Sequence, residues 1–390
     1  PAEVEAIEAF LLSQAEFRHN VITHHCEIRW TEEAGFLPLT DRDVNTLWGR
    51  MNKTVGRVYL TDIYNVIHSE FVPLFNPFQS YFDHLPSWDG VSDPIGDLAD
   101  TVHVKSDQAE FRDYFRKWFV GILPALLDDT VVNHEILVLI GEQGLYKTTW
   151  FNFLLPPELR CYFYTKTNSD RLNKDDLFSL TEFALICFEE LDGMRPAELN
   201  QLKAMVTMPY VNERAAYGRN KERHPHIASF CGTGNNVQFL TDPTGNRRWL
   251  PFEVSQIRDP HLHAIPYELV YSQAYALWKS GFCHWFSQEE IRKLNMHNSR
   301  FEVPNLEEDL IRTHFRKPFE GEAGIFVTAA DILEQISSCL RYPLSPNKIG
   351  RIMAGLEFES IRYKGKRGYI AVKKTGEDID RERRSGALGL

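Results

Sequence analysis

Apolar residues recur along the first third of the chain at spacings that predict helices and one pair of strands. Residues 3–17 carry Val, Ile, Phe and Leu close to helical spacing, which predicts an amphipathic helix. Residues 19–30 lead into a polar turn and are typical of a small strand pair, and residues 41–70 again have a helical pattern. A strongly apolar helix is predicted over residues 111–127, and Pro124 should kink or end it.

Three apolar runs in the middle of the chain each lead into polar residues that can do chemistry. Residues 136–140 (ILVLI) form the first run and end at Gly141. The second run, residues 183–188, ends in the paired acids Glu189 and Glu190, as expected of a parallel core strand. The third run, residues 227–231, continues into the amides Asn235 and Asn236. The alternation of such runs with helical patterns predicts an α/β fold.

The segment 141–149 has the spacing of a phosphate-binding loop. Gly141, Lys147 and Thr148 occupy the first, seventh and eighth positions of that pattern. Backbone N–H groups of such a loop cradle phosphate oxygens, while the lysine neutralises the β- and γ-phosphates of ATP and the hydroxyl helps to hold Mg²⁺. The candidate nucleotide-binding residues are Gly141, Gly144, Lys147, Thr148 and Thr149. The alternative is an ordinary strand, turn and helix with an incidental lysine.

Tyr146 departs from the loop pattern, which has glycine at that position. A tyrosine forced into the left-handed conformation costs about 1–2 kcal/mol more than glycine. A nearby glycine, Gly144, can supply the turn instead. The pattern therefore still predicts nucleotide binding, with the rate of turnover left open.

The paired acids and the amide supply the remaining parts of a hydrolytic site. One carboxylate at the strand end would hold Mg²⁺ through water and the next would activate the attacking water, so Glu189 is the candidate metal residue and Glu190 the candidate base. Asn235 would position the water against the γ-phosphate.

Two arginines, Arg247 and Arg248, stand just before another apolar run, residues 249–254. Such arginines can close the active site of a neighbouring subunit as an arginine finger. Taken singly, they are ordinary loop cations.

Two basic segments are candidates for contact with DNA. Arg219, Lys221 and Arg223 lie in a cation-rich stretch that is either a solvated loop or a basic hairpin that grips a nucleic-acid backbone. Lys364, Lys366 and Arg367 lie at a turn between two strands that follow two helices, which is the order of a winged helix. Winged helices bind DNA or serve only as protein contacts, and both interpretations stay open.

Composition limits these hypotheses. The chain has 390 residues, 43% hydrophobic and 25% charged, with a formal net charge of −11, so a uniformly basic nucleic-acid binder is excluded. Six widely spaced cysteines without a CxxC pair favour reduced thiols and a cytoplasmic location. No apolar run is long enough to span a membrane and no signal peptide opens the chain. The start at Pro1, without Met, leaves open that this is a fragment.

A metal site at His24, His25 and Cys26 is disfavoured. Adjacent side chains of a strand point to opposite faces, so the two histidines cannot both face one ion.

The order of these motifs resembles the virulence-associated protein E family, which consists of phage- and mobile-element-encoded ATPases related to superfamily 3 helicases. The resemblance rests on residues 141–151 (GEQGLYKTTWF), 232–240 (GTGNNVQFL) and 242–254 (DPTGNRRWLPFEV), with residues 76–90 upstream, and it covers roughly residues 75–255. It implies an ATP-dependent DNA motor that works as a ring and is often joined to a primase-like N-terminal part. It also implies the phosphate and Mg²⁺ roles for Lys147 and Thr148. Members of the family differ in how the acids at the strand end are arranged, so the resemblance lets Glu189 and Glu190 exchange roles, with Asp192 as a third acid nearby.

The expected architecture is an α/β, AAA+-like P-loop ATPase core of the superfamily 3 helicase type, with a helical N-terminal region and a C-terminal winged-helix-like domain. The expected divisions are residues 1–110, 111–255 (the core), 256–320 (an aromatic-rich helical bundle), 321–375 (winged helix) and 376–390 (a disordered tail).

The expected function is a DNA helicase or translocase acting in replication of a phage or mobile element. Its expected cofactors are ATP and Mg²⁺. Its expected partners are single-stranded DNA, further copies of the chain and a primase-like domain, and no membrane is expected to be involved. The alternatives are a nucleotide-binding switch with weak hydrolysis and a small-molecule kinase.

Overall fold

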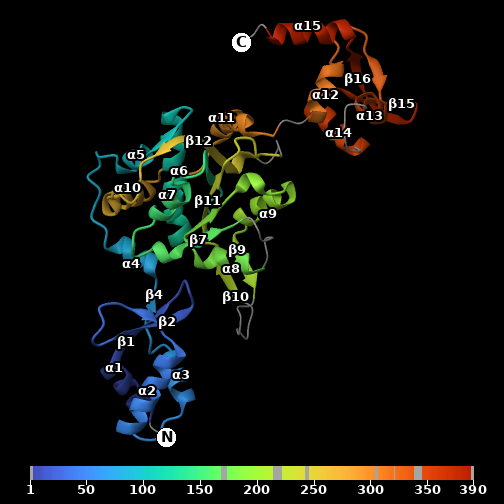
Figure 1. Cartoon of the computed structure of the whole chain (residues 1–390). Coiled ribbons are helices and arrows are strands. Elements are labelled where there is room, and N and C mark those ends of the chain that lie inside the picture. The colour runs from blue at the N-terminus through green and yellow to red at the C-terminus, as the bar shows by residue number, and fades with distance from the viewer. Residues whose placement is uncertain are drawn as a thin grey trace. The chain divides into compact units, whose positions relative to one another are not determined.

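The computed structural model divides the chain into two compact units, Pro1–Glu302 and Val303–Leu390 (Figure 1). It describes residues 3–167, 174–213, 222–241, 246–303, 306–319, 321–337 and 345–387. None of the helices in these ranges is long and apolar enough to cross a membrane.

The first unit begins with a small sheet covered by helices. The four strands have the order β3-β2-β1-β4, and β1 pairs with β2 in antiparallel register from Ala15 opposite Trp30 to Asn20 opposite His25. The elements are α1 (Val4–Gln14), β1 (Ala15–Asn20), β2 (His25–Trp30), β3 (Leu37–Pro38), α2 (Asp41–Thr54), α3 (Leu60–Ile67) and β4 (Leu74–Phe75).

The predicted strand pair and the helical pattern of residues 41–70 are confirmed, but the helix predicted over residues 3–17 ends at Gln14. Ala15 and the residues after it pair with β2 instead, because alternate side chains of β1 reach the core of this small sheet. His24 lies in the turn between β1 and β2, while Cys26 is buried and His25 is exposed, so His25 and Cys26 point to opposite faces.

A mixed sheet forms the centre of the first unit, with the order β5-β12-β6-β11-β8-β7. Five of its strands are parallel, and β5 pairs antiparallel with β12 at the edge. The strands are β5 (Val102–Val104), β6 (Ile136–Ile140), β7 (Phe163–Lys166), β8 (Leu185–Phe188), β11 (Ser229–Gly234) and β12 (Trp249–Ile257). The predicted α/β architecture with parallel core strands is confirmed.

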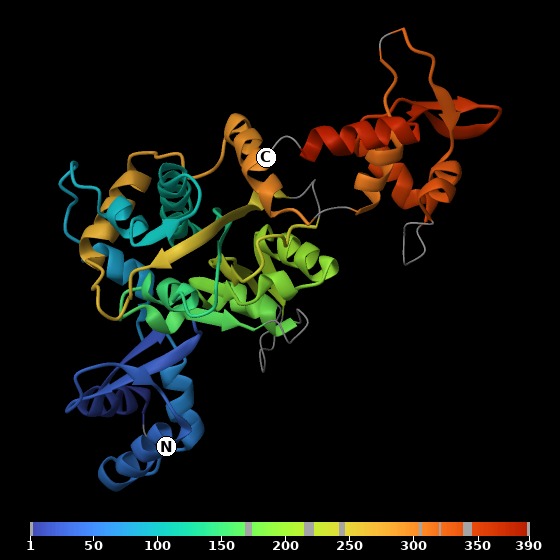
Figure 2. The same cartoon turned by 45° about the horizontal axis from the view of Figure 1, so that its top comes forward.

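Helices cover both faces of this sheet (Figures 1 and 2). They are α4 (Pro77–Asp83), α5 (Pro94–Ala99), α6 (Gln108–Leu127), α7 (Lys147–Phe153), α8 (Lys174–Glu182), α9 (Pro196–Val206), α10 (Tyr267–Lys279) and α11 (Gln288–Asn298). The described residues also form the short 3₁₀ turns η1 (Arg160–Tyr162), η2 (Leu191–Gly193), η3 (Asn246–Arg248) and η4 (Ser299–Phe301). A separate hairpin consists of β9 (Tyr210–Glu213) and β10 (Glu222–Pro225).

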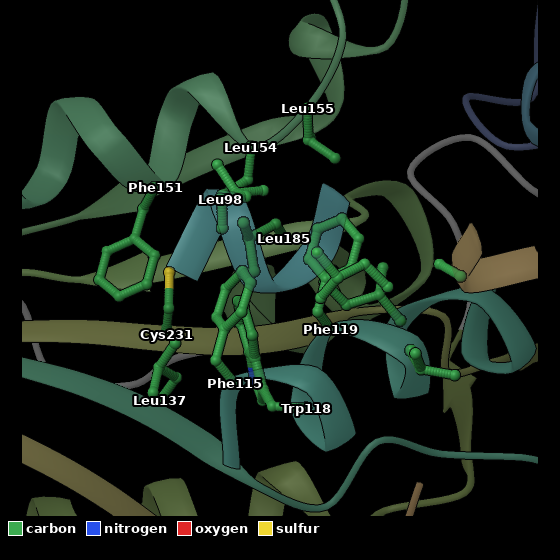
Figure 3. Close-up of a cluster of buried hydrophobic side chains, with 14 of the residues drawn as sticks. Leu98, Phe115, Trp118, Phe119, Leu137, Phe151, Leu154, Leu155, Leu185 and Cys231 are labelled. Atoms are coloured by element: carbon green, nitrogen blue, oxygen red, sulfur yellow. The ribbon is translucent and has the colours of Figure 1, made fainter. Parts of the chain in front are cut away.

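The side chains of β6 alternate between two apolar clusters, one on each face of the sheet. Leu137 and Leu139 join the cluster built with α6, α7 and α10, whereas Ile136, Val138 and Ile140 join the cluster built with α9. Figure 3 shows aromatic side chains of α6 packed with leucines and a cysteine of the strands. Burying each such side chain stabilises the fold by about 1.5–3 kcal/mol, so the strand that carries the central loop is anchored on both sides.

The expected boundaries of the core need correction. Strand β5, in the region assigned to residues 1–110, is the edge strand of the central sheet, because Val104 pairs with Val254 of β12. The segment 256–320, assigned to a separate helical bundle, is divided between the two units. Its residues up to Glu302 belong to the first unit, where Val270 and Tyr271 of α10 are buried against α6, and its residues from Val303 belong to the second. Helix α6 runs three residues past Pro124, whose carbonyl accepts a hydrogen bond from the backbone N–H of Asp128.

The second unit contains α12 (Leu306–His314), β13 (Phe315–Arg316), β14 (Ile325–Val327), α13 (Ala329–Ser337), α14 (Pro346–Gly355), β15 (Ser360–Tyr363), β16 (Lys366–Lys373) and α15 (Gly376–Ala387). Its core gathers apolar side chains of α12, α13, α14 and β16. The predicted order of two helices followed by a strand, a turn and a strand is confirmed.

The tail expected to be disordered instead forms α15 over most of its length. Its start is stabilised by a reciprocal pair of hydrogen bonds, in which the N–H of Thr375 donates to the Asp378 carboxylate and the N–H of Asp378 donates to the Thr375 hydroxyl.

Candidate functional site

Three parallel strands bring the predicted residues of the site to one edge of the sheet. In register, Ile140 of β6 lies opposite Gly234 of β11, and Phe188 of β8 lies opposite Gly232. Because the carboxyl ends of parallel strands meet at the same edge, the residues that follow them converge. They enclose a cleft of about 430 Å³ lined by Gln143, Gly144, Leu145, Tyr146, Lys147, Thr148, Thr149, Glu189, Glu190, Thr233, Gly234 and Asn235.

The loop after β6 is held close to the sheet. The backbone N–H of Gly141 donates to the carbonyl of Gly234 at 3.1 Å. A Cβ atom at position 141 would lie 2.9 Å from the carbonyl oxygen of Val254, so a larger residue would push the loop off β12. This close approach explains the glycine at the first position of the loop.

Two residues of the loop have positive φ angles. Gly144 has φ +88°, and Tyr146 has φ +61° and is 42% exposed. Gly144 therefore does not relieve Tyr146, because the turn uses the left-handed region at both positions. The tyrosine is strained, and its backbone still accepts a hydrogen bond from the N–H of Trp150 at 2.7 Å.

Replacing Tyr146 by glycine is expected to stabilise the protein. Removing the left-handed strain should raise the free energy of unfolding by about 1–2 kcal/mol. The greater freedom of glycine in the unfolded chain should lower it by about 0.5–1 kcal/mol. The free energy of unfolding, measured by urea denaturation, should therefore rise by about 0.5–1 kcal/mol. Gly144→Ala is the matched control and should lower it. A lower value for Tyr146→Gly would mean that contacts of the tyrosine ring outweigh its strain.

Lys147 is buried and its ammonium lies inside the loop. Its Nζ donates to the carbonyls of Gly141 and Glu142, both at 2.7 Å, and lies 3.5 Å from Oδ1 of Asn235. Burial lowers the pKa of Lys147, and the negative charge of Asp192 opposes that shift. The lysine thus spans the ends of β6 and β11, as a residue that binds an anion between them would.

Thr148 and Glu189 meet across the cleft. The Thr148 hydroxyl donates to Oε1 of Glu189 at 2.8 Å, and the N–H of Glu189 donates to the carbonyl of Lys166 on β7 at 3.0 Å. Paired hydroxyl and carboxylate oxygens are ligands that Mg²⁺ prefers. The described residues contain no group of three or more His, Cys, Asp or Glu that would hold a metal ion, so magnesium here would need oxygens from a phosphate and water.

Glu190 and Asp192 differ in their surroundings. Glu190 is exposed at the cleft with φ +54°, a strained conformation of the kind found at functional sites. Asp192 does not line the cleft; its carboxylate accepts hydrogen bonds from the backbone of Asn235 and Asn236. The sequence marked Asp192 only as a third acid, and no local pattern connects it with Asn235.

Arg247 and Arg248 lie at the opposite edge of the sheet. They precede β12, whose first residue, Trp249, is in register with the first residue of β6, Ile136. Strand β6 runs from Ile136 to Ile140, and the cleft lies at its far end. At about 3.3 Å per residue, this strand places the two arginines roughly 13 Å or more from the cleft. The structure therefore does not bring the two arginines to the other predicted site residues of the same chain.

The two arginines line a separate cavity of about 390 Å³ together with His134 and Glu135. Burial raises the pKa of Glu135 to about 7, and burial together with the charge of Arg247 lowers the pKa of Arg248. Arg247 is exposed, whereas Arg248 is partly buried.

Of the first basic segment, Arg219 and Lys221 lie outside the described residues. Arg223 is exposed on β10, with its guanidinium 3.3 Å from the ring centre of Tyr210. In the second unit, Lys364, Lys366 and Arg367 are all exposed at the β15–β16 turn. That turn has φ +46° at Lys364 and φ +78° at Gly365, the pattern of a tight two-residue hairpin.

A larger cavity, about 730 Å³, lies between the N-terminal sheet and the beginning of β7. None of the predicted site residues lines it. Its arginine, Arg18, is already paired with Glu27 and lies against the rings of Phe36 and Phe75. The candidate site is therefore the smaller cleft, where the chemically active groups converge.

The model of the virulence-associated protein E-like domain matches residues 83–303, more than half of the chain. The chain belongs to the virulence-associated protein E-like family. The matched region contains the whole central sheet and extends beyond the range 75–255, through α10 and α11. No curated protein matches the sequence.

Solved structures of one protein region align with most of this chain. An apo structure of the NrS-1 C-terminal region has a TM-score of 0.50 and 11% identity, with 95% of this chain and 99% of that chain covered. A second, A-form apo structure of the same region has a TM-score of 0.47 and 12% identity at the same coverage. At this identity the first likeness shows the fold alone, a mixed α/β fold with a parallel sheet.

Proposed function

We propose that this member of the virulence-associated protein E-like family is an ATP-dependent DNA translocase or helicase that acts in replication of a phage or mobile element. The observation that carries the proposal is the convergence of Lys147, Thr148, Glu189 and Asn235 at the ends of three neighbouring strands. Two contacts define this convergence. The Thr148 hydroxyl lies 2.8 Å from Oε1 of Glu189, and Nζ of Lys147 lies 3.5 Å from Oδ1 of Asn235.

Each residue of the cleft has its own role in the proposed ATP hydrolysis. The backbone of the loop 141–146 and the ammonium of Lys147 bind the β- and γ-phosphates. Thr148 and Glu189 would hold Mg²⁺, which would neutralise charge on the phosphates. Glu190, exposed at the cleft, accepts a proton from the attacking water, and Asn235 orients that water. Thr149 lines the same cleft beside Thr148.

Completion of the site requires a second copy of the chain. Since Arg247 and Arg248 lie at the far edge of the sheet, they can reach a γ-phosphate only in a neighbouring subunit. A head-to-tail interface that closes on itself gives a ring. We therefore include a homo-oligomeric ring in the proposal, with one of the two arginines as the finger.

Single-stranded DNA is the proposed substrate of the motor. The exposed cations of the β15–β16 turn follow two helices in the order of a winged helix, and Arg223 is exposed on β10 of the β9–β10 hairpin in the first unit. The net charge of −11 requires that DNA contacts come from such local clusters. A primase-like partner remains part of the proposal through the family resemblance.

The deciding experiment measures ATP hydrolysis with and without oligothymidylate. We expect DNA to stimulate turnover in the wild type. In a variant with Lys364, Lys366 and Arg367 replaced by alanine, stimulation should need more DNA, and the log–log salt slope of binding should fall by about 2. A triple replacement of Arg312, Arg316 and Lys317 is the control, because it changes the charge equally but removes cations already paired with acids.

Two other results would change the assignment. Tight ATP binding without turnover would favour the nucleotide-switch alternative. Turnover that depends on a small phosphate acceptor and ignores DNA would favour the kinase alternative.

A further inference from the structure

The 3₁₀ turn η2, which follows the paired acids, packs closely against two glycines of β11. Gly232 and Gly234 lie on one face of the strand, two residues apart. A Cβ atom at Gly232 would lie 2.2 Å from Cδ1 of Leu191, and one at Gly234 would lie 3.0 Å from Oδ1 of Asp192. The two glycines therefore make room for η2, and a side chain at either position would press against Leu191 or Asp192.

Asp192 uses this close approach to bind the end of β11. Its Oδ1 accepts the backbone N–H of Asn235 at 3.2 Å, and its Oδ2 accepts the backbone N–H of Asn236 at 3.0 Å. Hydrogen bonds to a carboxylate are roughly twice as strong as neutral ones. Both oxygens of one side chain thus hold two successive amides, which restricts the backbone of Asn235.

The same turn is attached directly to the acids of the cleft. Glu190 takes its left-handed conformation two residues after the end of β8, and the N–H of Gly193 donates to the carbonyl of Glu190 at 2.8 Å. Leu191 is buried beneath the turn. Glu189 and Glu190 are therefore joined to Asn235 through a short path that consists of η2 and the Asp192 carboxylate.

We propose that Asp192 is a positioning residue that fixes Asn235 relative to Glu189 and Glu190. The inference rests on the proposed function, because it assigns Asp192 a part in the hydrolysis at that site. Asp192 acts through Asn235, since it does not line the cleft. Its charge also reaches Lys147, so the test must separate nucleotide binding from turnover.

The first test needs no nucleotide. In Asp192→Asn one carboxylate oxygen becomes an N–H donor, so at least one of the two amides loses its acceptor. We expect amide hydrogen exchange at Asn235 or Asn236 to become about 10- to 100-fold faster. Asp89→Asn is the matched control, because Asp89 likewise accepts two successive backbone N–H groups, of Val91 and Ser92, away from the cleft.

A second variant reaches the same contact from the other side. Gly234→Ala places a methyl group against Oδ1 of Asp192 and should push the carboxylate away from the amides. It should reproduce the faster exchange with Asp192 intact, and it keeps the proposal testable if Asp192→Asn fails to fold. Unchanged exchange in both variants would overturn the proposal.

The third test is a double-mutant cycle on ATP turnover. Asp192→Asn should lower kcat about tenfold, which is the effect expected from the loss of one charge-assisted hydrogen bond. The Kd for ATP should change less than about threefold, because the loss acts on turnover. In an Asn235→Ala background the same substitution should lower kcat no further, because the residue being positioned is gone. A purely structural role would instead multiply the two losses, and that result would overturn the proposal.

The outcomes for the two proposals are distinguishable. A wild-type protein that folds but does not hydrolyse ATP under any condition overturns the proposed function. Wild-type hydrolysis combined with multiplicative losses overturns only the role of Asp192.

Discussion

Replacing Lys147 by alanine is expected to lower ATP hydrolysis at least about 100-fold, because removing one preorganised charge from a transition-state site typically costs that much. In the structure the Lys147 ammonium lies between the loop carbonyls and the Asn235 amide. Among the described residues that line the cleft, Lys147 is the only lysine or arginine, so no other cation can replace it. Phosphate release under steady-state conditions is the measurement.

The control for this prediction is Lys293→Ala, which removes an exposed lysine of α11 whose partner is Glu289 one helical turn away. Its turnover should equal that of the wild type. Unfolding by urea should be recorded for both variants, because Lys147 also donates to two backbone carbonyls and its loss can loosen the loop. Undiminished turnover in a folded Lys147→Ala protein would refute the assignment of the cleft.

The second large effect is expected at the far edge of the sheet. Loss of an arginine finger lowers turnover by about 10³- to 10⁵-fold. We expect this loss in Arg247→Ala or Arg248→Ala, with ATP binding retained because neither residue lines the cleft of its own chain. Arg247 is the more exposed of the two and is expected to give the larger effect. Arg292→Ala, an exposed arginine of α11, is the control.

Mixing experiments test whether the arginine acts in a neighbouring subunit. In an equal mixture of Lys147→Ala and the inactive arginine variant, a site is complete only where an intact lysine meets an intact arginine across an interface. Random assembly into head-to-tail rings makes about one interface in four complete, so about a quarter of wild-type activity should return. No recovery in mixed oligomers would show that the arginine does not act between subunits.

Several elements were predictable because their signals are local. The run 136–140 is apolar at every position, so it had to be buried on both faces, and β6 is. Pro196 marks the start of α9, and Ser345 with Pro346 marks the start of α14. The spacing of Gly141, Lys147 and Thr148 likewise lies within one short segment.

Elements that depend on distant partners were missed or misplaced. The first strand, β1, looked like the end of a helix because only pairing with β2 favours the extended form. The short strand β5 exists through its pairing with β12, about 150 residues away in sequence. The helices α10 and α11 have their own apolar faces, and nothing local indicates that these faces pack on α6 and β12.

The sequence by itself determined which chemical groups this protein carries, and that the loop, the paired acids and Asn235 each follow a buried strand. Only the tertiary structure decided which groups meet. The order of the strands places Asn235 beside Lys147, leaves Arg247 and Arg248 at the other edge, and brings Asp192 within hydrogen-bonding distance of the Asn235 backbone. The physical reason is that strand order depends on how the helices pack over the whole sheet, and no short segment of the chain carries that information.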